Sequence, residues 1–544
     1  MAELVDAPDS KSGGGDTMSV RFRPSVPIGS SLTRYHSLFI LLLELNINLN
    51  ITKKSFYPTI FIILSAFIIR LFTIGNTNLL VEEAYYWNYA NHLDFSYLDH
   101  PPVVAYLIKL STALFGNNEF AIRLPGLICW MITAIYSFKL SELIKPKSGI
   151  FTIFLLSFLP FFFIQSIIMT PDLPLLATWS SCLYYLYLVL VRDKNSYWYL
   201  AGITFGIGML SKYSIVLLVP SSLIFLLYTK QISKKLLTKE PYLATLLAII
   251  IFSPVIYWNA THNWVSFIFQ STRRFSEASE FTFHQLIGLL TLFLTPLGLI
   301  SLYQLFKKQQ IIKNQIDQKT KSFFQIFTLT PLLFFAAFSL SHEVKFNWIG
   351  PGLLAIIPWI AIQITTTDKK LNHWIGTAVI LLLFSLSLII CIATGKPRPV
   401  YQAIFTKFID WNKFEKKVTS IANNLTKEYN KSLVVIPLDK YNIASELAFY
   451  QTKDNNLESY HQIVGRNVLG LESLMYKYWY NGEDLQDKIL LLISEERYIF
   501  DILAVKNNTV PITKVSKFNA MAPKSNTKAK NYYYQAVKIN VTRP

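Results

Sequence analysis

Long apolar segments separated by short polar loops dominate the chain between residues 56 and 392. A helix that crosses a bilayer needs about 20 mostly apolar residues, and eleven segments approach that length. The pattern therefore predicts an α-helical polytopic membrane protein with about 11–13 transmembrane helices. The predicted spans are 56–74, 121–140, 150–168, 173–191, 198–210, 213–229, 241–258, 284–306, 323–340, 347–366 and 372–392. Residues 102–115 are too short to span and amphipathic, which favours a helix lying at the membrane interface.

The pattern changes after residue 394, where apolar runs shorten and polar residues increase. SLVVIPL (432–438) and KILLLIS (488–494) predict buried strands, and NIASELAFY (442–450) predicts a helix. YYYQAVKINV (532–541) alternates as a final strand does. We therefore expect a small soluble α/β domain at the C-terminus.

The first residues do not follow either pattern. Residues 1–35 are rich in Gly, Ser, Pro and Arg, and no apolar region precedes a signal-peptide cleavage site. They resemble the translation of a transfer-RNA gene, so we expect the native start downstream; the alternative is a disordered cytoplasmic tail. We divide the chain into an N-terminal tail (1–50), a transmembrane domain (51–394) and a soluble domain (395–544).

Composition and charge agree with a membrane protein. Hydrophobic residues make up 52% of the 544 residues and charged residues only 15%, against about 25% charged in soluble proteins. This excludes a disordered chain and an ordinary soluble enzyme. The net charge of +18 has its explanation in basic loops rather than in a nucleic-acid partner. The three cysteines, Cys129, Cys182 and Cys391, lie in apolar runs and predict neither disulfides nor a zinc site.

The basic residues also predict the orientation. With the N-terminus in the cytoplasm, the inner loops hold fifteen Lys and Arg residues and the outer loops five, as the positive-inside rule requires. Eleven crossings then place the soluble domain outside.

Unusual polar residues concentrate in the predicted outer loops. The acids are Glu82, Glu83 and Asp172, and the cations are Lys212, Arg273, Arg274 and Lys345. A carboxylate can act as a base, and cations can bind a phosphate and stabilise it as it departs. Together, beside a lipid phase, they suit a lipid-phosphate-linked substrate. Structural alternatives exist for each: Asp172 as a helix N-cap, the arginines as ligands of lipid headgroups.

Five motifs carry a resemblance to a known family. VEEAYYW (81–87), LDHPP (98–102), MTPDLP (169–174), KFNW (345–348) and ASELAFY (444–450) resemble bacterial members of the dolichyl-phosphate-mannose–protein mannosyltransferase superfamily. This superfamily belongs to the GT-C class of polytopic glycosyltransferases and includes the lipid A aminoarabinose transferases. The resemblance implies a GT-C fold, a sugar donor carried on a polyprenyl phosphate, and transfer at the outer face of the membrane.

The resemblance also implies roles for individual residues. The family's first outer loop usually begins with Asp-Glu, whose Asp orients or deprotonates the acceptor; here Glu82 and Glu83 stand in these positions. Asp172 matches the acid of the second outer loop. The acid–Lys–Pro–Pro stretch that helps to hold the donor phosphate or a metal begins here with Asp99 and His100.

These matches complete the predicted site. Its residues are catalytic Glu82, Glu83 and Asp172; donor-phosphate-binding His100, Lys212, Arg273, Arg274 and Lys345; and substrate-shaping Asp99, Asn347 and Trp348. No cofactor is required by this scheme, and a divalent metal is left open, since Asp99 with His262 or His342 would offer oxygen and nitrogen ligands.

The predicted function is transfer of a sugar from a polyprenyl-phosphate donor to an extracytoplasmic acceptor, with lipid A favoured. The resemblance implies single displacement with inversion. Transfer to protein or another envelope glycan, an inactive or partner-binding homologue, and a non-catalytic lipid or sugar transporter remain as alternatives. A transporter would place charges at mid-membrane, whereas the charges here gather at the outer ends. We expect the bacterial inner membrane as the location, with the site and the soluble domain on the periplasmic side.

Overall fold

The computed structural model describes residues 53–273, 280–307, 316–366, 368–405, 408–453, 460–480, 482, 485–524 and 528–540. The N-terminal tail and Arg274 lie outside these ranges. Residues Asn50–Pro544 form one compact unit, and the division at residue 394 stays a prediction.

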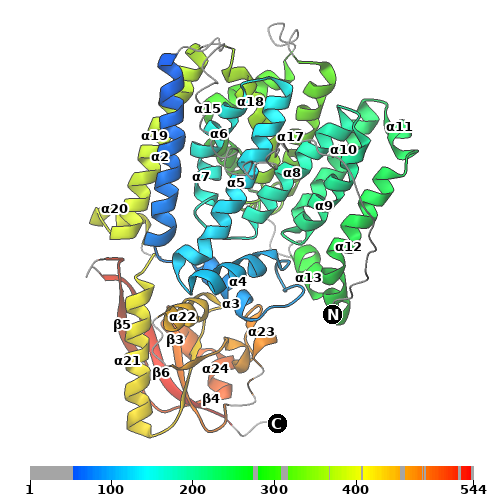
Figure 1. Cartoon of the computed structure of the whole chain (residues 1–544). Helices are drawn as coiled ribbons and strands as arrows, with labels where there is room; N and C mark the ends of the chain where they lie inside the picture. The colour runs from blue at the N-terminus through cyan, green and yellow to red at the C-terminus, as the bar shows by residue number, and fades with distance from the viewer. Residues whose placement is uncertain are drawn as a thin grey trace, which may run out of the picture. The chain divides into compact units, whose positions relative to one another are not determined.

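All eleven predicted segments are helical (Figure 1). The helices from the first segment to the last are α2 (Lys53–Asn76), α5 (Glu119–Ile144), α6 (Gly149–Phe158) with α7 (Pro160–Gln165), α8 (Asp172–Leu190), α9 (Trp198–Met209), η2 (Tyr213–Leu217) with α10 (Leu218–Tyr228), α12 (Glu240–Thr261), α15 (Phe283–Phe306), α17 (Gln318–Phe338), η4 (Gly350–Ala355) with α18 (Ile356–Ile364), and α19 (Asp368–Thr394).

Seven of these helices, counted among the described residues, are long and apolar enough to cross a membrane: α2, α5, α8, α12, α15, α17 and α19. The other four segments are shorter or interrupted. Two of them change helix type, where η2 leads into α10 and η4 into α18. A third breaks between α6 and α7, where Pro160 cannot donate a backbone hydrogen bond.

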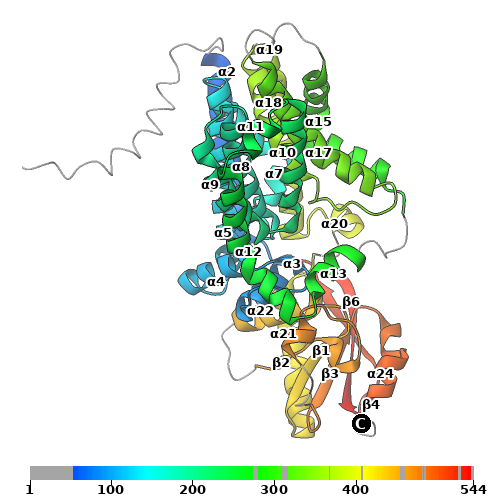
Figure 2. The same cartoon turned by 90° about the vertical axis from the view of Figure 1, so that its right-hand side faces the viewer.

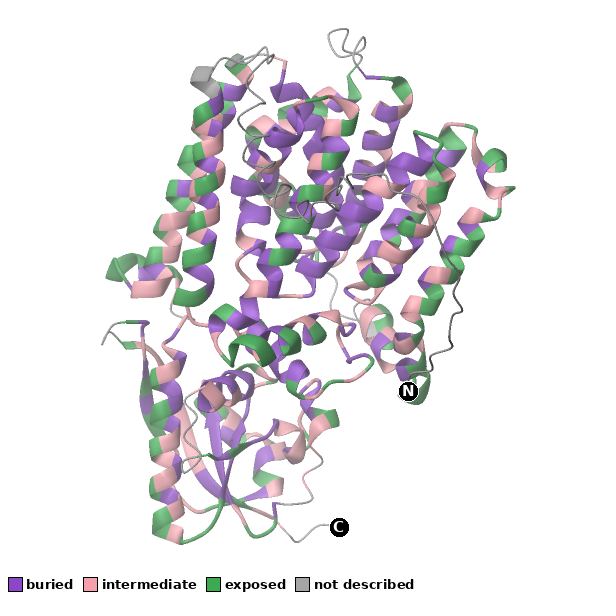
Figure 3. Ribbon diagram, in the orientation of Figure 1, coloured by how far each residue is buried: buried purple, intermediate pink, exposed green. Residues whose placement is uncertain are grey.

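Burial separates central helices from peripheral ones (Figure 3). In α8 nearly every residue is buried, and all residues of α18 are. In contrast, most residues in the apolar stretches of α2, α12 and α19 are exposed or only half-buried. Exposed apolar side chains on long helices are expected where a protein faces lipid, since lipid tails are as apolar as leucine.

A buried arginine supports the break between α6 and α7. Leu156 O lacks its usual helical partner because the residue four positions later is Pro160. Arg70 of α2 donates to Leu156 O at 3.3 Å and to Ser157 O at 2.9 Å, and its Nε donates to Ser166 Oγ at 2.6 Å. Its guanidinium also lies over the ring of Trp130 at 4.3 Å. The arginine thus replaces the donors that the break removes.

Arg70→Met is therefore expected to lower the apparent Tm of the detergent-solubilised protein. Ser157 O would lose its side-chain donor, Leu156 O would keep only the longer bond from Trp130 Nε1 at 3.4 Å, and a buried acceptor left unpaired costs about 1–3 kcal/mol. Adding Pro160→Ala should recover part of this loss, since alanine supplies the missing N–H. An Arg70→Met protein as stable as the wild type, or no recovery in the double variant, would contradict this account of the break.

Short helices connect the spans at the end where the predicted outer loops gather. They are α3 (Val81–Asn91), α4 (Val103–Phe115), α13 (Val265–Ile268) and η3 (Phe269–Arg273). Helix α4 confirms the helix expected over 102–115, and it lies crosswise to the long helices (Figures 1 and 2). At the other end, η1 (Asn195–Tyr197) and α11 (Ile232–Leu236) complete the connections. Helix α20 (Arg398–Ile404) follows α19 at the end nearer the sheet (Figure 1).

The C-terminal region folds as a mixed six-stranded sheet with flanking helices. The strands follow the order β2-β1-β3-β6-β4, and β5 also pairs with β6. Strands β1, β2 and β3 are parallel, whereas β6 runs antiparallel to its neighbours. The elements are α21 (Trp411–Tyr429), β1 (Leu433–Pro437), α22 (Asn442–Lys453), β2 (Gln462–Ile463), η6 (Arg466–Leu469), α23 (Tyr476–Trp479), β3 (Ile489–Ser494), η7 (Arg497–Asp501), α24 (Leu503–Asn508), β4 (Thr509–Pro511), β5 (Ser516–Met521) and β6 (Lys528–Ile539).

These elements confirm the strands and the helix expected from the sequence. Every residue of β1 and β3 is buried, as the continuous apolar runs indicated. Helix α22 packs against α3, so the sheet-bearing part contacts the first connecting segment of the helical part directly.

Candidate active site

The first turn of α3 carries two glutamates in different environments. Glu83 is fully buried and forms a two-point ion pair with Arg123 of α5, at 2.8 Å from Nε and 2.6 Å from Nη2. Its carboxylate also accepts the backbone N–H groups of Leu80 at 2.9 Å and Met169 at 2.8 Å. Glu83 therefore joins the first loop, the second loop and α5, and its oxygens are already occupied.

Glu82, the preceding residue, is exposed and lines a cavity of about 830 Å³. The walls of this cavity come from the turn before α3, the end of α19 and the C-terminal domain. Partial desolvation raises the pKa of the Glu82 carboxyl, the neighbouring Glu83 raises it further, and Lys345 lowers it. Glu82 is thus a carboxyl open to the cavity, with a pKa displaced toward neutrality.

Three predicted site residues from three loops meet at Asp172. Asp172 begins α8 and is almost fully buried, at 1% exposure. Lys212 Nζ lies 2.7 Å from Asp172 Oδ1, and Asn347 Nδ2 donates to Asp172 Oδ2 at 2.7 Å. The carboxylate at this helix N-terminus, where the helix dipole favours an anion, orients a cation and an amide.

Lys212 also lines an apolar pocket of about 310 Å³. His100 and Trp348 line the same pocket, so it gathers three of the predicted residues. Its remaining walls are mostly apolar, including Phe334, Phe335 and Phe338 of α17. The pocket offers an apolar surface with a cation at one side, which suits an isoprenoid phosphate.

Aromatic residues of α3 connect these groups. Tyr89 and Tyr85 donate their hydroxyls to Asp99 Oδ1, the latter at 3.4 Å. The Tyr86 ring packs edge-on against the His100 ring at 5.7 Å. Burial raises the pKa of the Tyr86 hydroxyl well above its usual value, and the charges of Asp99, Asp172 and Glu82 add to this. Tyr86 therefore lies within electrostatic reach of all three acids.

The remaining predicted residues are less closely placed. Lys345 is exposed, near enough to Glu82 to influence its pKa. Arg273 ends η3, and Arg274 falls outside the described residues. Within the described ranges, no group of three or more His, Cys, Asp and Glu side chains could hold a metal ion, so Asp99 is not joined with His262 or His342 in such a cluster.

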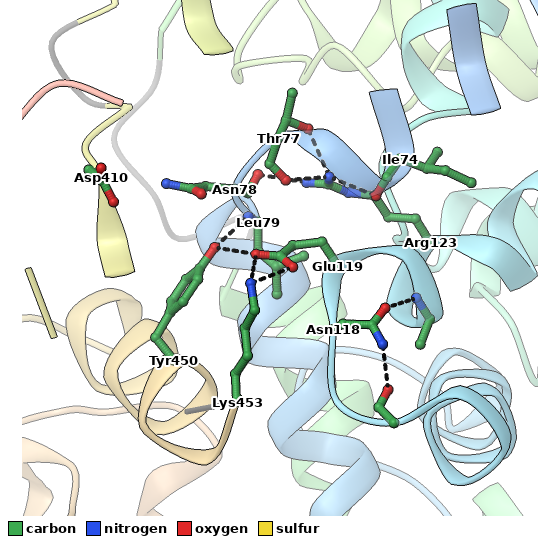
Figure 4. Close-up of polar contacts among 12 residues, drawn as sticks. Ile74, Thr77, Asn78, Leu79, Asn118, Glu119, Arg123, Asp410, Tyr450 and Lys453 are labelled. Atoms are coloured by element: carbon green, nitrogen blue, oxygen red, sulfur yellow. Dashed lines mark hydrogen bonds and ion pairs between the residues drawn. The ribbon is translucent and has the colours of Figure 1, made fainter. Parts of the chain in front are cut away.

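Sequence reasoning missed the residues that join the C-terminal domain to this site. Tyr450 of α22 accepts the backbone N–H of Leu79 at 3.1 Å and donates to Glu119 at 3.3 Å. Lys453 binds both oxygens of Glu119, at 2.7 and 2.8 Å (Figure 4). The available signal was the spacing of Glu446, Tyr450 and Lys453, which places them on one face of a helix.

Comparison with protein families matches residues 99–258 to the family described as dolichyl-phosphate-mannose-protein mannosyltransferase. Among curated proteins, "Lipid A galacturonosyltransferase RgtD" from Rhizobium johnstonii is 26% identical over 189 residues, which are 34% of this chain and 40% of that protein. An uncharacterized protein from Aquifex aeolicus is 25% identical over 156 residues, covering 28% of this chain and 31% of its own length. The alignments thus span less than half of these relatives.

Two solved structures share the fold. The crystal structures of ArnT from Cupriavidus metallidurans, in the apo state and bound to undecaprenyl phosphate, each match with a TM-score of 0.58 at 12% identity. Each match covers 88% of this chain and 97% of ArnT. The predicted fold of a multi-pass helical membrane protein with a small C-terminal sheet domain is therefore confirmed. The resemblance to the mannosyltransferase superfamily is supported by the family match over residues 99–258 and by the similarity to RgtD.

Proposed function

We propose that this protein is a glycosyltransferase that moves a sugar from a polyprenyl-phosphate donor to lipid A at the periplasmic face of the bacterial inner membrane. The observation that carries the proposal is the Asp172–Lys212–Asn347 cluster beside an apolar pocket, with Glu82 open to a second cavity. The proteins that it resembles support the substrate classes: RgtD is named a lipid A transferase, and ArnT was crystallised with undecaprenyl phosphate.

The donor belongs in the apolar pocket. Its isoprenoid chain lies along the phenylalanines of α17, and its phosphate meets Lys212 and His100. An ammonium group carries three N–H donors. Asp172 accepts one of them and fixes the side chain, so the others are directed to the phosphate. Lys345, which lies near enough to Glu82 to lower its pKa, adds positive charge from a neighbouring loop. The phosphate-binding roles of Arg273 and Arg274 stay predictions from the sequence.

The acceptor approaches from the larger cavity. Its hydroxyl oxygen attacks the anomeric carbon, and the carbon–oxygen bond to the phosphate breaks with its electron pair passing to the phosphate oxygen. The hydroxyl proton moves to the Glu82 carboxylate, so Glu82 is the general base. Glu83, whose oxygens are occupied by Arg123 and two backbone amides, positions this turn and takes no proton. The anomeric centre is inverted.

Mass spectrometry of lipid A from cells with and without the gene tests the proposal. We expect a sugar-sized mass increment only in cells that carry the gene. Unchanged lipid A in the presence of folded protein would reject lipid A as the acceptor, and other envelope glycans and proteins would then be assayed with lipid-linked sugars.

Glu82→Gln is expected to lower the transfer rate by about 10²–10⁴, the usual contribution of a general base. Because the pKa of Glu82 is raised, wild-type activity should fall on acidification at a pH above the usual glutamate value of about 4.3. The activity of Glu82→Gln should not show this fall at low pH. Glu343→Gln, which changes another exposed acid, is the matched control. A loss of less than tenfold in Glu82→Gln would contradict the base role.

A further inference from the structure

Glu446 is a buried carboxyl that the mechanism above does not use. It lies on α22 with 0% exposure, and neither of its oxygens has a hydrogen-bond partner among the described residues. A buried ionised carboxylate without a partner is strongly unfavourable, whereas the protonated form is far less so. Glu446 therefore occupies a site that accepts only its neutral form.

The charged groups around Glu446 give the same result. Glu82 and Glu83 face it from α3, Glu119 and Arg123 from α5, Tyr476 from α23, and Tyr532 from β6; Tyr450 and Lys453 follow it on α22 itself. Both nearby cations are occupied. Arg123 donates to Glu83. Figure 4 shows the other contacts: Lys453 binds Glu119, and Arg123 donates to the backbone oxygens of Ile74, Thr77 and Asn78.

The pKa of the Glu446 carboxyl is raised well above its ordinary value, and burial is the largest cause. The charges of Glu83 and Glu82 raise it further, and that of Arg123 partly offsets them. Glu83 and Glu446 thus both lie near Arg123, and the arginine is committed to Glu83.

The position of Glu446 on α22 connects it with the site. One turn earlier, Asn442 and Ile443 line the same cavity as Glu82. One turn later, Tyr450 holds the backbone of Leu79, just before the turn that carries Glu82. Glu446 therefore lies behind the Glu82 turn, between the cavity wall and the contacts that fasten α22 to the helical part.

We propose that Glu446 is a positioning residue for Glu82: its neutral carboxyl allows α22 to pack against the turn that carries Glu82, and its ionisation drives the two apart. The inference rests on the proposed glycosyl transfer, because Glu82 is the group whose position it controls. It gives the C-terminal domain a part in the reaction, since α22 holds the acceptor side of the site in place.

The sign of the pH dependence follows from the raised pKa. The pKa of the Glu446 carboxyl is higher in the folded protein than in the unfolded chain. At a pH between these two values the folded protein binds one more proton than the unfolded chain, so the free energy of unfolding falls as the pH rises through this range. Glu446→Gln stays neutral at every pH and escapes this loss. The apparent Tm of the variant should therefore exceed that of the wild type by a margin that grows from pH 5 to pH 9.

Transfer kinetics supply the second measurement, which a purely structural role would not change. Wild-type kcat/KM should fall at alkaline pH by about tenfold per pH unit above the pKa of Glu446, and Glu446→Gln should lack this limb. Glu446→Met, neutral and of similar length, should behave like the glutamine variant. Glu415→Gln is the matched control, because Glu415 is also buried in the C-terminal domain but binds Thr419 at 2.6 Å.

The outcomes separate this inference from the proposed function. If the wild-type protein is active and its kcat/KM falls at alkaline pH in the same way as in both variants, the role of Glu446 is overturned and the proposed function is not. A Tm difference that does not grow with pH overturns it as well. A folded wild-type protein that transfers no sugar at any pH overturns the proposed function, and the coupling to Glu82 with it.

Discussion

Asp172→Asn is expected to lower kcat/KM for sugar transfer by about 10²–10³, the range found when one preorganised electrostatic group is removed. Asp172 is the only described residue that accepts a hydrogen bond from Lys212 Nζ, and it also holds Asn347. Without its charge, the lysine loses the partner that aims it at the donor phosphate. Because that phosphate becomes more negative as it leaves, kcat should fall together with kcat/KM.

The control for this variant is Asp317→Asn. Asp317 also stands at a helix N-terminus, where it accepts the backbone N–H of Thr320 at 2.6 Å, and asparagine caps equally well. Its activity should match the wild type. The double variant Asp172→Asn with Lys212→Met should lose little more than the more damaging single variant, since the two residues act as a unit. Additive losses, or an Asp172→Asn protein within tenfold of the wild type, would contradict this pairing.

Periodicity was sufficient to predict the eleven apolar helical segments and the strands β1, β3 and β6, because apolar runs report directly on burial in lipid or in a sheet core. It did not predict the amphipathic helix α21 or the short strands β2, β4 and β5. It was weaker for the length of a span. The segment 150–168 divides at Pro160. The side chain that donates hydrogen bonds across this break belongs to Arg70, more than 80 positions earlier in the chain. Donors supplied from a distant helix leave no local pattern.

The candidate site shows the same limit. Loop position alone suggested that Asp172, Lys212 and Asn347 would gather, and the structure brings them into contact. The resemblance matched Glu82 to the acid that orients the acceptor, but the pattern of residues alone did not separate the roles of Glu82 and Glu83, and both were placed in the catalytic set. Adjacent residues on a helix point about 100° apart, so one faces the cavity and the other faces Arg123, and nothing local in the chain indicates which. Glu446 was missed because its burial depends on the packing of α22 against α3.

Glu83→Gln is expected to destabilise the protein by about 3–5 kcal/mol, the usual cost of removing one partner of a buried ion pair. Arg123 would remain buried at 3% exposure with its charge uncompensated. Arg123→Met should be comparably damaging, because it leaves Glu83 fully buried and also frees the carbonyls of Thr77 and Asn78. Apparent Tm in detergent and the yield of folded protein measure both effects.

The neighbouring glutamate provides the sharpest control. Glu82→Gln changes the same residue type one position away, yet it should leave the apparent Tm close to that of the wild type because Glu82 is exposed. The double variant Glu83→Gln with Arg123→Met should be less destabilised than the sum of the single variants, because it leaves neither charge alone in the interior. If Glu83→Gln kept its stability and lost only transfer, Glu83 would be acting in the reaction itself. The opposite pattern, with Glu82 needed for transfer and Glu83 for stability, separates the two roles within one turn of α3.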